Sequence, residues 1–169
     1  MAFIKSDVEL KSSVFQMIGK QWLLISAGTE KSFNSMTASW GAFGVLWNKY
    51  TATVYVRPER YTYGFLETND RFSLCLFGEK HREALVVMGT KSGRDMDKPA
   101  ACGLSPVFID GVPAYAEAET VFICKKIYSD NLRAENMGED GLSVYAAGSG
   151  IHKMYIGEIL GLYRNDARQ

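Results

Sequence analysis

Polar and apolar positions alternate along much of the chain, and this alternation predicts a protein built mainly from β-strands. The clearest example is Tyr50–Val56, whose TATVYV portion changes between polar and apolar side chains at every residue, as a strand with one buried face requires. We expect this strand to form a hairpin with Met36–Trp47, turning at Asn48 and Lys49.

Other segments extend the β pattern and place short helices between the strands. Strand-like runs occur at Gln21–Ala27, Arg71–Phe77, Ala114–Tyr128 and His152–Tyr163. Short helices are predicted at Pro58–Thr68, Lys80–Met88 and Asp95–Cys102. In the last strand, Gly157 and Gly161 predict a bulge or a close approach of a neighbouring segment. Because turns and short helices join the strands, we expect a closed or partly closed antiparallel barrel rather than a doubly wound parallel sheet.

The overall composition excludes several classes of protein. The 169 residues contain 19 Lys and Arg against 19 Asp and Glu, so the formal net charge is zero. Nucleic-acid-binding proteins usually carry a surplus of basic residues, so we expect no nucleic-acid partner. The longest nearly uncharged stretch, Ser32–Trp47, is too short and too polar to cross a bilayer, so we expect no membrane partner either. No linker or repeat divides the sequence, which predicts a single domain over residues 1–169.

Cysteine and histidine usage favours a cytoplasmic protein without a metal centre. The three cysteines, Cys75, Cys102 and Cys124, are odd in number and far apart, which favours reduced thiols over a disulfide framework. With only His81 and His152, and no metal-ligand spacing, we expect no metal site. The sequence also contains neither a G-x-x-x-x-G-K-[ST] phosphate loop nor a G-x-S-x-G nucleophile elbow.

A first candidate site is Phe33–Trp40, whose sequence FNSMTASW groups small polar side chains near the edge of a predicted strand. Small side chains let a ligand approach the backbone, whose N–H groups then donate hydrogen bonds to it. A polar strand edge followed by a packed Trp40 explains the same residues without a ligand. Composition alone favours this simpler interpretation.

A second candidate is the segment Val54–Asn69, in which a strand leads through Arg57 into a predicted helix start with Arg60 and Thr62. Helix N-termini offer unpaired N–H donors, and arginine adds planar donors suited to phosphate oxygens. The segment is therefore a candidate phosphate site without a glycine-rich loop. A solvated basic turn, with Glu59 as the partner of the arginines, is the alternative.

Two further candidates carry less information. The segment Lys91–Leu104 crowds charged residues after a predicted helix; it is either a loop of solvated ion pairs or a source of Lys98 for an anionic ring or phosphate. His152 begins the last long strand, and a lone histidine in a strand is more often structural than catalytic.

Taken together, these segments resemble the flavin reductase-like family of FMN-binding split barrels, and in particular its flavoredoxin-like branch. The motifs are N-S-M-T-A-S-W at Asn34–Trp40, V-x-V-R-P-x-R-x-T at Val54–Thr62, S-G-R-D-x-D-K at Ser92–Lys98 and H-x-x-Y-I-G-E-I at His152–Ile159. They occur in the order typical of the family. The chain departs from the pattern at Pro99, where an aromatic residue is more usual.

The resemblance implies a six-stranded antiparallel Greek-key split β-barrel with short peripheral helices, which binds FMN without a covalent bond and forms a homodimer with the flavin near the subunit interface. Seven consecutive residues would line the isoalloxazine ring and the ribityl chain: Asn34, Ser35, Met36, Thr37, Ala38, Ser39 and Trp40. Arg57, Arg60 and Thr62 would hold the phosphate. Lys98 and His152 would lie beside the flavin or a nicotinamide.

The same resemblance implies that FMN carries the redox chemistry, so that no catalytic side chain is required. Our first hypothesis is an NAD(P)H-dependent flavin reductase, which passes hydride through bound FMN to free flavin or another acceptor. The alternative is a flavoredoxin-like carrier that shuttles electrons between protein partners without nicotinamide turnover of its own. A flavin-binding or structural barrel without turnover is the third hypothesis.

Overall fold

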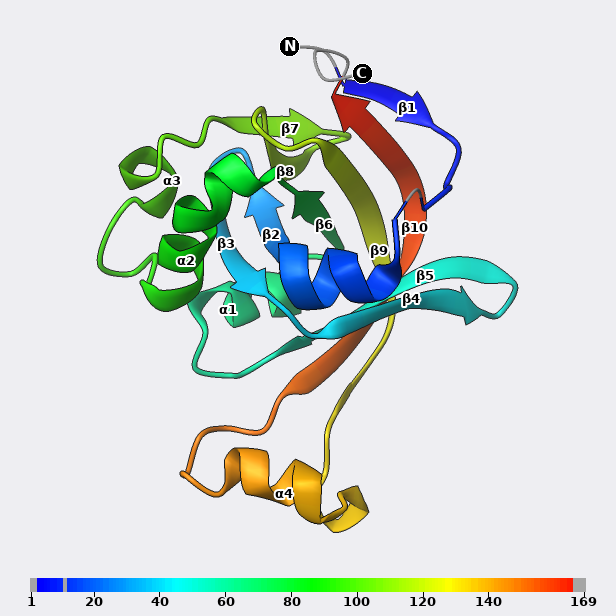
Figure 1. The fold of residues 1–169 in the computed structure, drawn as a ribbon, viewed down its shortest axis with the longest axis vertical. Helices are drawn as coiled ribbons and strands as arrows, with labels where there is room; N and C mark the ends of the chain where they lie inside the picture. The colour runs from blue at the N-terminus through cyan, green and yellow to red at the C-terminus, as the bar shows by residue number, and fades with distance from the viewer. Residues whose placement is uncertain (1–2, 11, 166–169) are drawn as a thin grey trace.

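Ten strands and seven helical segments make up the part of the chain that the computed structural model describes, residues 3–10 and 12–165 (Figure 1). The strands are β1 Phe3–Ser6, β2 Leu23–Thr29, β3 Ser32–Ala38, β4 Gly41–Leu46, β5 Lys49–Val56, β6 Arg71–Leu76, β7 Pro106–Ile109, β8 Val112–Tyr115, β9 Thr120–Asn131 and β10 Lys153–Asn165. The helical segments are η1 Gln16–Gln21, α1 Tyr61–Thr68, η2 Glu79–His81, α2 Arg82–Thr90, α3 Lys98–Ala101, η3 Ala134–Asn136 and α4 Glu139–Tyr145.

The main sheet is antiparallel and follows the order β3–β2–β6–β9–β10–β5–β4, with β1 paired to β10 beside this path. The six strands from β3 to β5 curve so that β3 and β5 approach each other, yet no strand pairing joins these two within the described residues. The fold is therefore mainly β, with a barrel that is split between β3 and β5, as the sequence predicts. The sheet has eight strands rather than six, because β4 pairs with β5 as a hairpin and β1 adds to β10.

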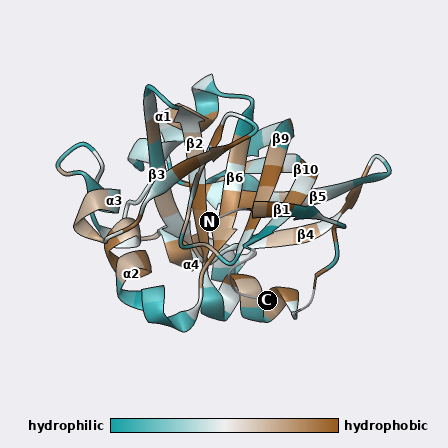
Figure 2. Ribbon diagram, turned by 90° about the horizontal axis from the view of Figure 1, so that it is seen from above, coloured by the Kyte–Doolittle hydropathy of each residue, from teal (hydrophilic) through white to brown (hydrophobic). Residues whose placement is uncertain are grey.

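Two apolar cores lie on the two faces of the central strands, because successive side chains of a strand point to opposite sides. Ile25 and Leu74 belong to the core inside the barrel, which draws residues from all six barrel strands. Leu24 and Cys75, their neighbours in sequence, pack instead with α2 and β8 outside the barrel. Figure 2 shows apolar residues along the central strands β6 and β9. Burying each large aliphatic side chain stabilises the fold by about 1.5–3 kcal/mol.

The last strand, β10, is irregular where the sequence predicts a bulge. Its register against β9 shifts between Ile156 and Gly157 and again between Ile159 and Gly161. A Cβ on Gly157 would collide with the ring of Phe72 and with the Cβ of Cys124. Glycine is therefore required at position 157, because β10 passes too close to the neighbouring strands for any side chain.

Two expected long strands are each broken in two. The predicted strand Met36–Trp47 contains the end of β3 and all of β4, separated by Ser39 and Trp40, because β3 pairs with β2 whereas β4 pairs with β5. The predicted strand Ala114–Tyr128 is likewise divided between β8 and β9, which belong to different sheets. In both cases the chain changes its pairing partner, which the alternation of side chains does not reveal.

The predicted helices are present, with shifted ends. Helix α1 begins at Tyr61 rather than at Pro58, because residues 57–60 form a turn in which the Arg60 N–H donates to the Arg57 carbonyl at 3.1 Å. Helix α2 continues past Gly89 to Thr90. The third helix, α3, is shorter than Asp95–Cys102. Within the described residues, none of the helices has the length and apolar character needed to cross a membrane.

Candidate functional site

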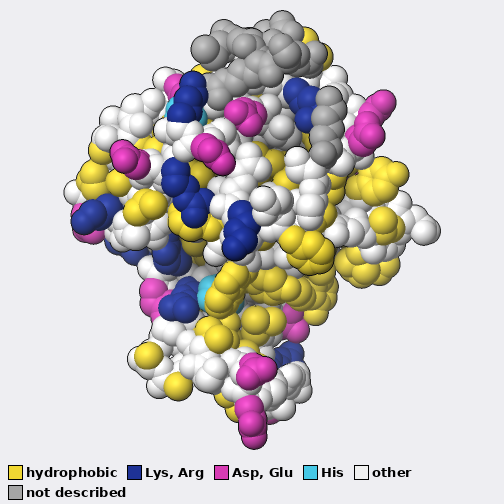
Figure 3. Space-filling model, viewed as in Figure 1, with side chains coloured by type: hydrophobic (Ala, Val, Ile, Leu, Met, Phe, Trp, Pro, Cys, Tyr) yellow, Lys and Arg dark blue, Asp and Glu magenta, His cyan; other side chains and the backbone are white. Residues whose placement is uncertain are grey.

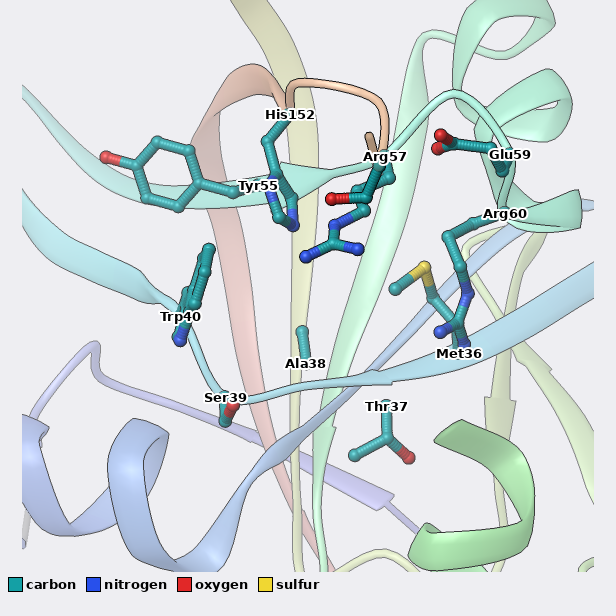
Figure 4. Close-up of a pocket in the computed structure, with 11 residues that line it drawn as sticks. Met36, Thr37, Ala38, Ser39, Trp40, Tyr55, Arg57, Glu59, Arg60 and His152 are labelled. Carbon is teal, nitrogen blue, oxygen red and sulfur yellow. The ribbon is translucent and has the colours of Figure 1, made fainter. Parts of the chain in front are cut away.

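A pocket of about 440 Å³ lies between the end of β3, the end of β5 and the start of β10 (Figure 4). Its lining consists of Met36, Thr37, Ala38, Ser39, Trp40, Tyr55, Arg57, Glu59, Arg60, Ser149 and His152. The structure thus brings together eight of the residues that the sequence marks as candidates, from three distant segments. These eight are Met36, Thr37, Ala38, Ser39, Trp40, Arg57, Arg60 and His152.

Two arginines, Arg57 and Arg60, bring positive charge to the pocket. Arg57 follows β5 and Arg60 immediately precedes α1, and Figure 4 shows both side chains among the residues that line the pocket. Neither guanidinium forms an ion pair anywhere in residues 3–10 and 12–165. Burial, together with the charge of Arg57, lowers the pKa of Arg60 from its ordinary value. Glu59 lines the same pocket, but its carboxylate accepts a hydrogen bond from the Gly150 N–H rather than forming an ion pair with either arginine. Two guanidiniums beside one carboxylate leave a local positive charge that is suited to a phosphate group.

Two polar side chains of β3, Ser35 and Thr37, form hydrogen bonds that tie the strand to neighbouring elements. The Ser35 hydroxyl donates to the Ser26 hydroxyl at 2.7 Å and bonds the Tyr115 hydroxyl at 2.7 Å in a buried network. The Thr37 hydroxyl donates to the Leu85 carbonyl of α2 at 2.6 Å. The pocket therefore meets β3 largely through its backbone and its apolar side chains. Ser35 does not line this pocket.

A second pocket of about 190 Å³ adjoins the first and shares Met36, Glu59 and Arg60 with it. It contains three of the four remaining candidate residues, Asn34, Thr62 and Lys98, together with the segment 90–94, and Ser35 is the one candidate that lines neither pocket. The Asn34 amide donates to the Thr62 hydroxyl at 2.7 Å, which joins β3 to α1. Together the two pockets form one elongated site with Arg60 at the junction.

Arg94 lines the smaller pocket and is the third guanidinium of the elongated site. It stacks over the Tyr61 ring at 4.7 Å from the centroid and donates to the Glu59 carbonyl at 3.3 Å. The adjacent Gly93 lies so close to Asn34 that a Cβ there would collide with the Asn34 side-chain oxygen. The loop therefore needs glycine at this position to bring Arg94 beside the pocket.

Lys98 is a buried cation, only 2% exposed, at the start of α3. Its ammonium donates to the Ser35 carbonyl at 2.6 Å and to the Met88 carbonyl at 3.0 Å. Burial, reinforced by the charge of Arg60, lowers the pKa of Lys98 to about 8. Lys98 thus supports the rear of β3 and adds positive potential to the smaller pocket.

His152 lies between two aromatic rings at the edge of the larger pocket. The Trp40 ring centroid is 4.8 Å away, and the Tyr145 hydroxyl is 2.8 Å from Nδ1. Burial and the nearby Arg57 lower the pKa of His152 to about 4, so the imidazole is neutral near pH 7. Residue 152 therefore offers hydrogen-bonding groups to the pocket rather than a charge.

Several residues around the site carry no signal in the sequence alone. Ser149 enters through the long connection between β9 and β10, and the Gly150 N–H of that connection donates to the Glu59 carboxylate at 2.5 Å. Tyr55 belongs to the alternation of β5 and is a pocket residue only because of the strand's position. Tyr145 is seven residues before His152 in sequence, and only the fold of the connection brings the two side chains together.

Comparison with a family model identifies a match over most of the chain. The model described as "Flavin reductase like domain" matches residues 16–169. No sequence among the curated proteins matches the chain.

Solved structures share the fold at low sequence identity. An FMN-binding protein from Thermus thermophilus, with bound 1-cyclohex-2-enone, is 18% identical with a TM-score of 0.70, covering 98% of this chain and 82% of that one. The flavoredoxin of Desulfovibrio vulgaris (Miyazaki F) is 19% identical with a TM-score of 0.69, covering 97% and 78%. The styrene monooxygenase flavin reductase of Pseudomonas putida S12 is 17% identical with a TM-score of 0.64, covering 87% and 80%.

Proposed function

Because the chain belongs to the flavin reductase-like domain family, we propose that it is an FMN-binding oxidoreductase that accepts hydride from NADH or NADPH. Electrons then pass through the bound FMN to free flavin or another acceptor. The observation that carries this proposal is the pair Arg57 and Arg60, two guanidiniums without an ion-pair partner in the described residues, at a pocket lined by β3.

The elongated site fits FMN in chemical character. An FMN molecule combines a flat aromatic ring system, a polar chain and a phosphate dianion. Met36, Ala38 and Trp40 supply apolar surface for a ring, and Arg57 and Arg60 supply charge-assisted donors for a phosphate. The connected smaller pocket, with Arg94, extends this positive region. We assign the phosphate to the arginines, and we place Thr62 beside it as the residue that fixes Asn34.

FMN supplies the two-electron redox chemistry when it is bound, and the protein contributes position and electrostatics. Arg60 and Lys98 raise the positive potential beside β3, which favours negative charge on a bound ligand. The hydrogen bonds of Ser35 and Thr37 to neighbouring elements fix β3 in place. A rigid strand keeps its backbone donors in one geometry, so they need not reorganise during the reaction.

Trp40 and the neutral His152 are our candidates for contact with the nicotinamide. Both line the larger pocket, and Trp40 is 46% exposed. A nicotinamide that stacks against a bound flavin ring needs only an accessible face, so a dedicated Rossmann fold is not required. The three free thiols Cys75, Cys102 and Cys124 support a reducing compartment, and we therefore propose that the reaction takes place in the cytoplasm.

Anaerobic reduction tests the proposal. The purified protein, loaded with FMN, should be yellow and should bleach on addition of NADH or NADPH, followed as loss of flavin absorbance. A protein that takes up no FMN from solution would contradict the proposal. Aerobic oxidation of the nicotinamide with added free FMN then tests turnover.

The second candidate is an electron carrier without nicotinamide turnover. Flavoredoxins of Methanosarcina acetivorans and Desulfovibrio vulgaris are among the structures that share the fold, which favours this alternative. In that case the FMN-loaded protein would stay yellow with either nicotinamide and would bleach on mixing with a reduced electron-transfer protein.

We also propose a homodimer, with the partner covering the apolar surface next to the pocket. An apolar groove of about 820 Å³ adjoins the site and includes Phe15, which is 88% exposed, and Trp40. Figure 3 shows apolar side chains gathered where the barrel meets the α4 connection. Exposed apolar surface of this kind marks interaction sites. Light scattering after size-exclusion chromatography should give twice the 18.8 kDa chain mass, and Phe15→Asp should shift the protein towards the monomer.

A further inference from the structure

The connection between β9 and β10 supplies Ser149 to the larger pocket, and its Tyr145, which lines the adjoining apolar groove, contacts the pocket residue His152. Residues 132–152 leave the barrel, form η3 and α4, and return at His152 (Figure 1). Three hydrogen bonds hold this connection, either to the barrel or between its own residues. The Leu132 N–H donates to the His152 carbonyl at 3.0 Å, the Gly150 N–H donates to Glu59, and the Tyr145 hydroxyl meets His152 Nδ1.

The surroundings of His152 keep its ring uncharged. The groups that face it are Arg57 from the end of β5, Glu59 and Arg60 from the turn before α1, and Tyr145 from α4. Burial and the two arginines oppose a positive imidazole, and the attraction of Glu59 is too weak to reverse this. In a neutral imidazole one ring nitrogen carries a proton and donates, and the other is unprotonated and accepts. The hydrogen bond at Nδ1 therefore determines whether Nε2 is a donor or an acceptor.

A phenol is a stronger acid than the N–H of a neutral imidazole, and an imidazole nitrogen is a stronger base than a phenol oxygen. The favoured arrangement at Nδ1 is therefore the Tyr145 hydroxyl donating and the His152 nitrogen accepting. The ring proton then resides on Nε2. Within the described part of the chain the only hydrogen bond of the ring is the one at Nδ1, which leaves the Nε2–H free to donate to a ligand in the pocket.

We propose that Tyr145 is a positioning residue that holds His152 as a neutral Nε2–H donor to a carbonyl oxygen of the molecule bound in the larger pocket. The proposal deepens the proposed function, on which it rests for the identity of that molecule, a flavin or a nicotinamide carboxamide. The state of the ring itself does not depend on the cofactor. A second contact orients the ring, because Trp40 packs against His152 at 4.8 Å between centroids.

Nitrogen-15 NMR of histidine-labelled protein tests the proposal directly, since the chain has only two histidines. His152→Gln assigns the signals. In the wild type we expect the Nε2–H tautomer to dominate by about fivefold or more and to show no titration between pH 5 and pH 8, because the His152 pKa is about 4. In Tyr145→Phe we expect a mixture of tautomers.

Tyr50→Phe is the matched control, because Tyr50 is 61% exposed on β5 away from the pocket. It should leave the His152 signals unchanged. An Nδ1–H tautomer in the wild type, a titration of His152 in the ordinary range near pH 6.5, or identical spectra for Tyr145→Phe and Tyr50→Phe would overturn the proposal. If the protein takes up no FMN, the proposed function fails while the tautomer result still stands.

A kinetic measurement separates positioning from mere packing. If the Nε2–H contacts the nicotinamide, Tyr145→Phe should raise the KM for that nucleotide by about fivefold while FMN affinity stays at the wild-type value. If it contacts the flavin, FMN affinity should fall instead. A Tyr145→Phe protein with both values unchanged would contradict the proposed role.

Discussion

Basic residues lie beside both ends of helix α1, and their surroundings differ. At the C-terminal end, Glu67 accepts hydrogen bonds from Lys153 at 2.8 Å and from the Tyr155 hydroxyl at 2.7 Å. At the N-terminal end, Arg57 and Arg60 form no ion pair within the described residues. The cation at the C-terminal end is paired within the protein, and we propose that a ligand pairs with the two cations at the N-terminal end.

Under the proposed function, this contrast accounts for anion binding by a chain with zero net charge. The balance of 19 basic and 19 acidic residues is a property of the whole chain, whereas binding depends on charges within a few ångströms. Paired cations such as Lys153 contribute to the fold, whereas the proposed function assigns ligand recognition to Arg57 and Arg60, which form no ion pair in the described residues. A functional site is thus recognised by missing partners rather than by a surplus of one residue type.

The largest expected effect is on ligand binding at the N-terminal end. The double variant Arg57→Ala/Arg60→Ala should weaken FMN binding by about 100-fold or more, because it removes charge-assisted hydrogen bonds worth about 1.5–3 kcal/mol each. Riboflavin, which has no phosphate, should lose much less, and fluorescence titration of both ligands measures the difference. Lys153→Ala is the control, with FMN affinity expected at the wild-type value. Equal losses for the two flavins would remove the phosphate role of the arginines.

The next largest effect is on stability, at the C-terminal end. Glu67→Ala should lower the free energy of unfolding by about 1–3 kcal/mol, because it leaves the hydroxyl of buried Tyr155 without its acceptor. FMN affinity should not change. Urea denaturation measures the loss, and a stable Glu67→Ala protein with weakened FMN binding would show that the two ends are not separate in function.

The same carboxylate predicts a dependence on acid. Burial opposes ionisation of Glu67, but the hydrogen bonds from Lys153 and Tyr155 outweigh it and lower the pKa of Glu67 below 4.5. The stabilisation is therefore present above the ordinary pKa and is lost as the pH falls through the lowered value. The stability difference between wild type and Glu67→Gln should shrink below about pH 4, as measured by urea denaturation at a series of pH values.

A smaller effect comes from Lys98, the buried cation behind the N-terminal end. Its pKa in the folded protein is about 8, against an ordinary 10.5. Between these values the unfolded chain holds a proton that the folded protein has released, so stability rises with pH. From about pH 7.5 to pH 9.5 the wild type should gain about 1–2 kcal/mol relative to Lys98→Met. Parallel pH profiles for the two proteins would show that Lys98 keeps its ordinary pKa.

Local patterns in the sequence predict the strands and the chemistry better than they predict the connections. The alternation in Tyr50–Val56 reflects one buried and one outer face of β5, and the fold preserves it. The alternation does not predict the break at Ser39 and Trp40, because a change of pairing partner leaves no trace in it. The proline at position 58 predicts a helix start that lies too early, because a proline that opens a turn and one that opens a helix share the same φ preference.

The site shows the same limit. Short motifs locate Arg57, Arg60 and His152, because each motif carries its chemistry in a few neighbouring residues. The motif around Asn34–Trp40 does not tell which side chains point inward, and Ser35 proved to face a buried network with Ser26 and Tyr115. Such contacts join segments far apart in sequence, and only the folded chain determines them.

Strand β1 has a consequence for the handling of this protein. One edge of β10 is shared, since Lys153–Glu158 pair with β5 and Leu162–Asn165 pair with β1. Removing β1 would therefore expose unpaired backbone donors and acceptors along Leu162–Asn165 of β10. Open edges of this kind template edge-to-edge aggregation. A short segment remote from the pocket thus protects the barrel against self-association into insoluble material.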